Sequence, residues 1–150
     1  MATAARSRSR SAARLAAVQA LYQYEMEATP LTKLLAEFHE HRLGRWIEDE
    51  EYAAAENEFF DDVVAGAIAR ADELDALIAA RLADGWSIER LDKPMKSILR
   101  AGAYELLARS DVPTASAISE YVDVAKAFYD RREVGFVNGL LDALARDVRT

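Results

Sequence analysis

Apolar residues recur every three or four positions along most of this 150-residue chain, and no segment alternates apolar and polar residues over a convincing length. The first pattern is typical of helices with one buried face, and the lack of the second argues against β-strands. The expected helices cover residues 11–28, 31–38, 57–83, 94–107, 114–129 and 137–144, with a short turn at 87–90.

Proline and glycine separate these apolar stretches. Thr29-Pro30 and Asp111-Val112-Pro113 each end one helix and begin the next, and Pro94 opens another, because proline is tolerated in a first helical turn. Gly85 suits a helix C-cap, where a left-handed backbone is common. Glu40 to Glu58 is acidic and indicates a solvated loop or a short helix. We therefore predict an all-α, compact single-domain bundle of six or seven helices.

The composition narrows the classes of function. The chain has no cysteine, which excludes disulfides and cysteine-based sites and fits a reducing cytoplasm. It has no apolar run of about eighteen residues, so we expect no membrane span. His39 and His41 have no third metal ligand, and neither a Ser-His-Asp pattern nor a glycine-rich phosphate loop is present. We expect no metal, no cofactor and no catalysis.

Four arginines stand at the start of a chain whose formal net charge is -7. They are Arg6, Arg8, Arg10 and Arg14, and no acidic residue precedes Glu25. Residues 1–10 are expected to form a flexible arm, and residues 11–150 the helical domain. Guanidinium groups bind phosphates with forked geometry, and arginine-rich arms often become ordered on RNA. The alternative is a tail that only improves solubility.

A second basic segment precedes the last predicted helix. Arg131 and Arg132 come shortly before Phe136, which we place near the helix start, where free N–H groups attract anions. An exposed aromatic ring beside arginines suits stacking on an unpaired base, although Phe136 could equally be a core residue. Phe128 is expected to be a core residue more than an RNA contact. Asn138 is expected to bond a backbone group or a ligand.

Several short motifs follow one another in a defined order. They are Arg10–Arg14 with Val18–Tyr22, Ile98–Arg100 with Tyr104–Leu106, Asp111–Pro113, Ile118–Glu120, Val124–Lys126 and Phe136–Gly139. Each is weak alone, but the ordered set resembles the NusB family of bacterial transcription antitermination factors over nearly the whole chain.

This resemblance implies an all-helical fold without enzymatic activity. It also implies binding to the boxA segment of nascent, chiefly ribosomal, RNA together with the ribosomal protein NusE. That pair would promote assembly of an antitermination complex with other Nus factors on RNA polymerase. The residues then expected on the RNA side are Arg6, Arg8, Arg10, Arg14, Lys126, Arg131, Arg132 and Phe136. Tyr22 would lie toward NusE.

The chain departs from the family pattern at a few positions. Gly135 stands where a basic residue often precedes the Phe-Val-Asn-Gly motif, and Arg131 and Arg132 could replace that charge. Met95 occupies a position where a charged contact to NusE would be expected. The acidic stretch from Glu48 to Glu58 should face away from RNA, because like charges repel.

Other functions stay open at this point. One is a NusB-like domain of the kind fused to rRNA cytosine methyltransferases, which is disfavoured because no glycine-rich cofactor domain precedes the end at Thr150. Another is a helical homodimerisation module, whose dimer would hide the RNA face. An enzyme of an unrelated class is disfavoured by the lack of a catalytic constellation.

Overall fold

Seven α-helices and one 3₁₀ turn make up the part of the chain that the structure describes. The computed structural model describes the backbone of residues 2–41 and 50–149, and the side chains of residues 8–40 and 56–149. The elements are α1 (Ala2–Glu27), α2 (Leu31–His41), α3 (Glu50–Ala69), α4 (Ala71–Ala79), η2 (Ile88–Arg90), α5 (Lys93–Ala108), α6 (Thr114–Lys126) and α7 (Arg131–Val148). No strand occurs within these residues, so the predicted all-α class is confirmed.

The predicted helix boundaries at the prolines are confirmed. Ala28 follows α1 with a left-handed φ of 52°, and the Pro30 carbonyl then accepts a hydrogen bond from the N–H of Leu34 over 2.9 Å, which starts α2. Pro94 lies in the first turn of α5, and Pro113 directly precedes α6. Each proline sits where its missing N–H removes no helical hydrogen bond.

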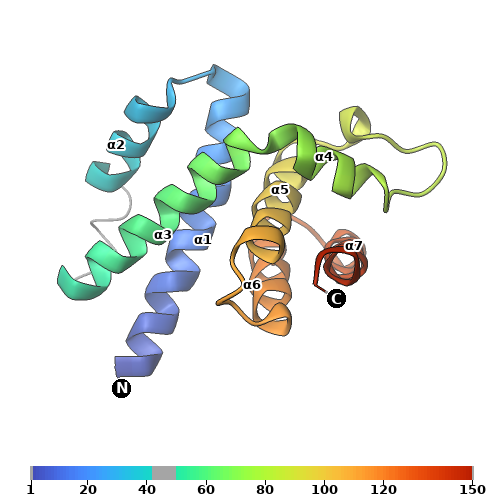
Figure 1. Cartoon of the computed structure of the whole chain (residues 1–150). Helices are drawn as coiled ribbons and strands as arrows, with labels where there is room; N and C mark the ends of the chain where they lie inside the picture. Colours follow the sequence, from blue (N-terminus) through green and yellow to red (C-terminus); the bar gives the residue numbers. More distant parts are fainter. Residues whose placement is uncertain (1, 42–49, 150) are drawn as a thin grey trace.

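Several predicted elements differ from those observed, and the first helix and the helix predicted over 57–83 are two of them. The first helix begins at Ala2 instead of residue 11, so residues 2–10 continue α1, while their flexibility in solution stays a prediction. The single helix predicted over 57–83 is wrong, because the chain leaves helical geometry at Arg70, with φ -108° and ψ 23°. The second piece, α4, turns away from α3 and packs on α5 (Figure 1). Gly85 lies beyond its end, in a turn with φ 87°.

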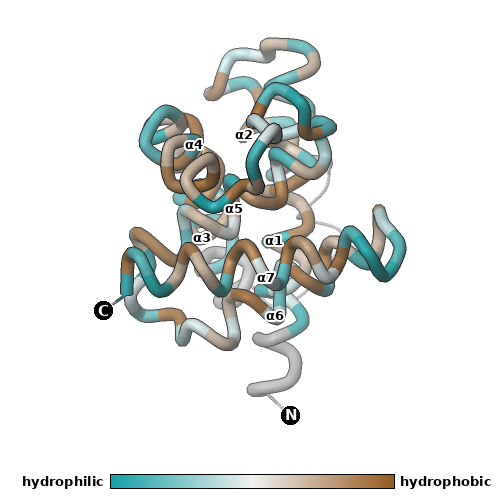
Figure 2. The backbone as a smooth tube through the Cα atoms, turned by 90° about the vertical axis from the view of Figure 1, so that its right-hand side faces the viewer, coloured by the Kyte–Doolittle hydropathy of each residue, from teal (hydrophilic) through white to brown (hydrophobic). Residues whose placement is uncertain are grey.

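Helix α5 is the centre of the bundle. It contacts α1, α3, α4, α6 and α7, and ten of its sixteen residues are buried. The hydropathy colouring of Figure 2 shows apolar segments on the sides where these helices meet. The burial of α5 on nearly all sides explains why its polar residues need partners inside the protein.

Small side chains let the helices around α5 approach closely. On α1, the fully buried positions include Ala13, Ala16, Ala17 and Ala20, and this helix packs along α3. On α3, Gly66 faces the ring of Tyr104, and a Cβ at this glycine would lie 2.2 Å from the nearest ring carbon. The close packing of α3 on α5 therefore requires the absence of a side chain at Gly66.

One arginine closes the corner between α5, α6 and α7. The guanidinium of Arg149 donates to the carbonyl oxygens of Glu105, Leu106, Arg109 and Val112 and to the hydroxyl of Thr114, over 2.6 to 3.2 Å. The last carbonyls of a helix have no partner within the helix. Arg149 supplies partners at the end of α5 and so joins it to the end of α7.

Candidate nucleic-acid interface

The arginines of α1 differ strongly in their surroundings. Arg8 is exposed, whereas Arg14 is 4% exposed and lies between helices. Arg14 donates from Nε and Nη2 to the two carboxylate oxygens of Glu105, over 2.8 and 3.0 Å. The expectation that Arg14 contacts RNA is thus contradicted by its burial, because its fork is already filled by an internal carboxylate. The side chain of Arg6 lies outside the described residues.

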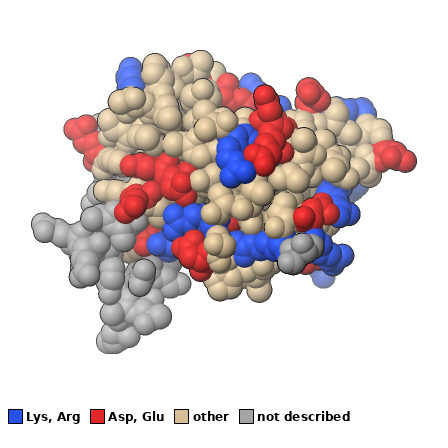
Figure 3. Space-filling model, viewed as in Figure 1, with Lys and Arg blue, Asp and Glu red and all other residues tan. Residues whose placement is uncertain are grey.

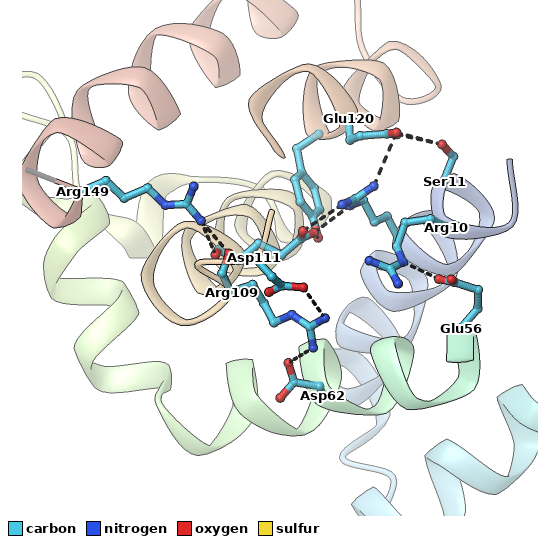
Figure 4. A network of polar contacts seen from close by, with 11 residues as sticks. Arg10, Ser11, Glu56, Asp62, Arg109, Asp111, Glu120 and Arg149 are labelled. Carbon is cyan, nitrogen blue, oxygen red and sulfur yellow. Dashed lines mark hydrogen bonds and ion pairs between the residues drawn. The ribbon is translucent and has the colours of Figure 1, made fainter. Parts of the chain in front are cut away.

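Glu105 is the hub of this buried network. Figure 4 shows the polar contacts of this region, with Ser11 and Glu120 labelled. Glu105 is 0% exposed and also accepts a hydrogen bond from the hydroxyl of Tyr121, which is itself fully buried. Burial, followed by the negative charge of Glu105, raises the pKa of Tyr121 well above its usual value. Burial alone would lower the pKa of Arg14, but the hydrogen bond and charge of Glu105 raise it overall. Arg14 and Tyr121 therefore both keep their protons.

Arg10 occupies an intermediate position at the surface. Its side chain is 21% exposed, and its Nε donates to Glu56 on α3 over 2.5 Å. Its guanidinium carbon lies 4.0 Å from the centre of the Phe59 ring. Glu56 belongs to the acidic stretch that was expected to face away from RNA. At this residue the expectation stays a prediction, and Glu56 is buried against Arg10, which is itself expected to contact RNA; residues 48 and 49 lie outside the described part.

The basic residues before Phe136 lie in the first turn of α7. Since this helix begins at Arg131, both Arg131 and Arg132 are helical and exposed. Phe136 is half-buried in the second turn, so its own N–H belongs to the helix interior and is not a free donor. The prediction that Phe136 marks a helix start is wrong by one and a half turns. Lys126 is exposed at the end of α6, with Asp123 at 3.3 Å.

The two faces of α7 carry different hollows. Between α6 and α7, a shallow groove of about 560 Å³ includes Ser119, Arg131, Gly135 and Asn138. On the other side, a hollow of about 540 Å³ lies against the α4–α5 connection, and its lining is mostly apolar. It is lined by Leu82, Ala83, Trp86, Arg90, Leu91, Asp92, Met95, Tyr129, Arg132, Glu133 and Phe136. Arg131 and Arg132 thus face different hollows, a separation that the sequence did not indicate.

Helix α6 brings the two ends of the chain together. On one side, Ser11 of α1 donates to both carboxylate oxygens of Glu120, over 3.0 and 2.9 Å. The preceding residue, Ser119, lines the groove that Arg131 shares from α7. The arginine-bearing half of α1 and the basic start of α7 therefore flank the same helix.

Exposed aromatic residues mark other parts of the surface. Tyr22 is 39% exposed on α1, one turn before Met26, which is 50% exposed. Phe128 is 42% exposed, so the expectation that it leans toward the core is wrong. Asn138 is also exposed and needs no internal partner. Trp86, which follows Gly85 in the sequence, is 56% exposed beside the hollow and lies under Arg90.

The described residues contain neither a candidate metal site nor a helix that could span a membrane. They contain no group of three or more potential ligands arranged for a metal ion. His39 instead approaches Asp61 over 2.6 Å, and the His41 side chain lies outside the described part. None of the described helices combines the length and the apolar character needed to cross a bilayer. Acidic and basic side chains alternate over the face in Figure 3, so positive charge is local.

The described part of the chain is thus an all-helical bundle with local basic surfaces and a buried ion pair. The sequence profile of the NusB family matches residues 11–146. The transcription antitermination protein NusB of Sphingopyxis alaskensis is 69% identical over 144 residues, which are 96% of this chain and 97% of that protein. That of Novosphingobium aromaticivorans is 66% identical over 142 residues, or 95% of this chain and 96% of that protein.

Solved structures agree with this assignment. NusB of T. maritima superposes with a TM-score of 0.77 at 30% identity, covering 94% of this chain and 93% of that chain. A chain in the complex of the antitermination factors NusB and NusE with dsRNA gives a TM-score of 0.78 at 26% identity, covering 93% and 98%. This chain belongs to the NusB family, whose members are transcription antitermination factors and not enzymes.

Proposed function

We propose that this protein binds the boxA segment of nascent, chiefly ribosomal, RNA together with NusE. The pair would then promote assembly of an antitermination complex with other Nus factors on RNA polymerase, in the cytoplasm. The observation that carries the proposal is the position of α6, which is flanked by the arginine-bearing half of α1 and by the basic start of α7. The solved complex of NusB and NusE with dsRNA supports it by similarity.

The RNA contacts proposed are the exposed or half-exposed members of the predicted set. They are Arg8, Arg10, Lys126, Arg131, Arg132 and the half-buried Phe136, with Arg6 added from the sequence. Their cations would neutralise phosphates, and the Phe136 ring would stack on a base. Arg14 is left out because Glu105 holds its guanidinium.

Tyr22 is the residue proposed to contact NusE. Its exposed ring and the exposed Met26 form a small apolar area on α1, at the end of the helix away from the arginines. Aromatic residues and methionine are enriched in protein–protein interfaces. RNA and NusE would thus meet opposite ends of α1.

A titration with labelled boxA RNA tests the proposal. We expect weak binding by the protein alone and tighter binding with NusE, because the second protein adds contacts to the same RNA. A scrambled RNA of equal length is the control, since phosphate contacts alone do not distinguish sequences. Equal affinity for the two RNAs, with and without NusE, would contradict the specific function.

A further inference from the structure

The guanidinium of Arg10 contacts two residues of α3, but its two terminal nitrogens are not used in these contacts. The hydrogen bond from Nε to Glu56 fixes one edge of the guanidinium, and the Phe59 ring supports one face at 4.0 Å. Among the described residues, Glu56 is the hydrogen-bond acceptor for Arg10, and it engages Nε alone. Since a guanidinium has five N–H donors, the two terminal nitrogens keep the donors that suit a phosphate.

Glu56 depends on Arg10 for its counter-charge and for its hydrogen bond. Glu56 is 0% exposed, and its Oε1 has no hydrogen-bond partner in the described part of the chain. A buried carboxylate without a counter-charge is strongly disfavoured. Displacing Arg10 would leave Glu56 in that state, so an anion is expected to bind the open edge of the guanidinium and leave the Glu56 contact in place.

The neighbouring turn provides an internal comparison. Arg14 uses both Nε and Nη2 on Glu105, and its side chain is 5% exposed, against 21% for Arg10. In the core, the bidentate contact with Glu105 therefore occupies the Nε and Nη2 donors of Arg14. The single contact of Arg10 orients the side chain and leaves its terminal nitrogens unused.

We propose that Glu56, supported by Phe59, is a positioning residue that presents the terminal nitrogens of Arg10 to a phosphate of bound RNA. The inference rests on the proposed RNA-binding function. A free arginine side chain loses rotamer entropy when it binds, whereas one already ordered in the free protein avoids most of that loss. The charge of Glu56 opposes RNA only weakly, because Arg10 neutralises it and lies between it and the ligand.

A double-mutant cycle tests this role in the full chain with NusE. Glu56→Leu is expected to weaken boxA binding by about two- to tenfold, the range given by ordering one long side chain. In an Arg10→Ala background, the same substitution is expected to have no effect. Glu58→Gln, which removes an exposed acid from the same helix, is the matched control and should leave binding equal or slightly tighter. The inference is overturned if Glu56→Leu tightens binding, or if it weakens binding equally in both backgrounds.

A measurement without RNA separates positioning from folding. In the free protein, exchange of the Arg10 Nε–H proton should be slow, and it should become fast in Glu56→Leu. Glu56→Gln keeps an acceptor and is the fallback if the leucine variant unfolds; it should preserve intermediate protection. Unchanged exchange of the Arg10 Nε–H proton in both variants would show that the hydrogen bond to Glu56 does not order this side chain.

The failure of the proposed function has a different signature. If the wild-type protein binds boxA and scrambled RNA alike, the boxA function fails, but the cycle on either RNA still measures the positioning of Arg10. If boxA is bound selectively and the cycle shows no coupling, the role of Glu56 alone is wrong.

Discussion

Arg10 and Arg14 lie one helical turn apart on α1, yet one is presented at the surface and the other is closed within the core. The sequence predicts a basic cluster because the arginines are close together. It does not separate their roles, since their partners are 46 and 91 positions away along the chain. The sequence signal that could have helped is the acidic residue in Tyr104-Glu105-Leu106, where a charge stands inside an apolar stripe.

The burial of Arg14 leads to a stability prediction. Arg14→Ala should lower the free energy of unfolding by about 3–5 kcal/mol, because Glu105 would remain buried without its counter-charge. Chemical denaturation measures the loss. Arg8→Ala, at an exposed position, is the control and should change stability by less than about 0.5 kcal/mol. Weaker RNA binding by Arg14→Ala at unchanged stability would instead restore it as an RNA contact.

At the scale of helices, the break at Arg70 is a feature that hydrophobic periodicity could not predict. The apolar stripe of α3 continues through α4, so the sequence predicts one helix. The change of direction is stabilised by distant contacts, such as the paired hydrogen bonds of 2.8 Å from Arg100 on α5 to Asp75 on α4. The ends marked by proline were predictable because their cause lies within the residues themselves.

The packing of α3 on α5 can be tested with two glycines. Gly66→Ala should destabilise the protein by about 1–3 kcal/mol, because the new methyl group would overlap the Tyr104 ring. Gly135→Ala on α7 is the matched variant, since its Cβ would meet nothing within 4 Å. Alanine favours a helix over glycine, so this variant should gain about 0.5–1 kcal/mol. Thermal unfolding of both variants measures the difference, and equal effects would show that the α3–α5 contact is looser than described.

The whole molecule combines a net negative charge with local positive surfaces. The fold class was predictable because helical periodicity and the ordered motifs extend over nearly the whole chain. The site was predictable only in part, because the division of Arg131 and Phe136 between two hollows depends on how α7 lies against α6 and α5. The contribution of Trp86 to the second hollow had no signal beyond a tryptophan beside a glycine.

The salt dependence of RNA binding reports these local charges. Replacing both Arg131 and Arg132 by alanine should reduce the magnitude of the slope of log K against log salt by about 1.4, since each phosphate contact on a single strand contributes about 0.7. Arg146→Ala is the control, because this exposed arginine near the other end of α7 pairs with Asp142. Its removal should leave the slope unchanged. An unaltered slope in the double variant would place the RNA elsewhere.

The guanidinium of Arg149 also sets an order of events during synthesis. The carbonyl oxygens it caps belong to residues 105, 106, 109 and 112, which leave the ribosome some forty positions earlier. The oxygens of residues 105 and 109 also accept backbone N–H groups, whereas those of residues 106 and 112 depend on Arg149. Until Arg149 emerges, water has to hydrate these two oxygens at the corner between α5 and α6 in the nascent chain. The docking of one side chain at the end of α7 therefore completes the fold.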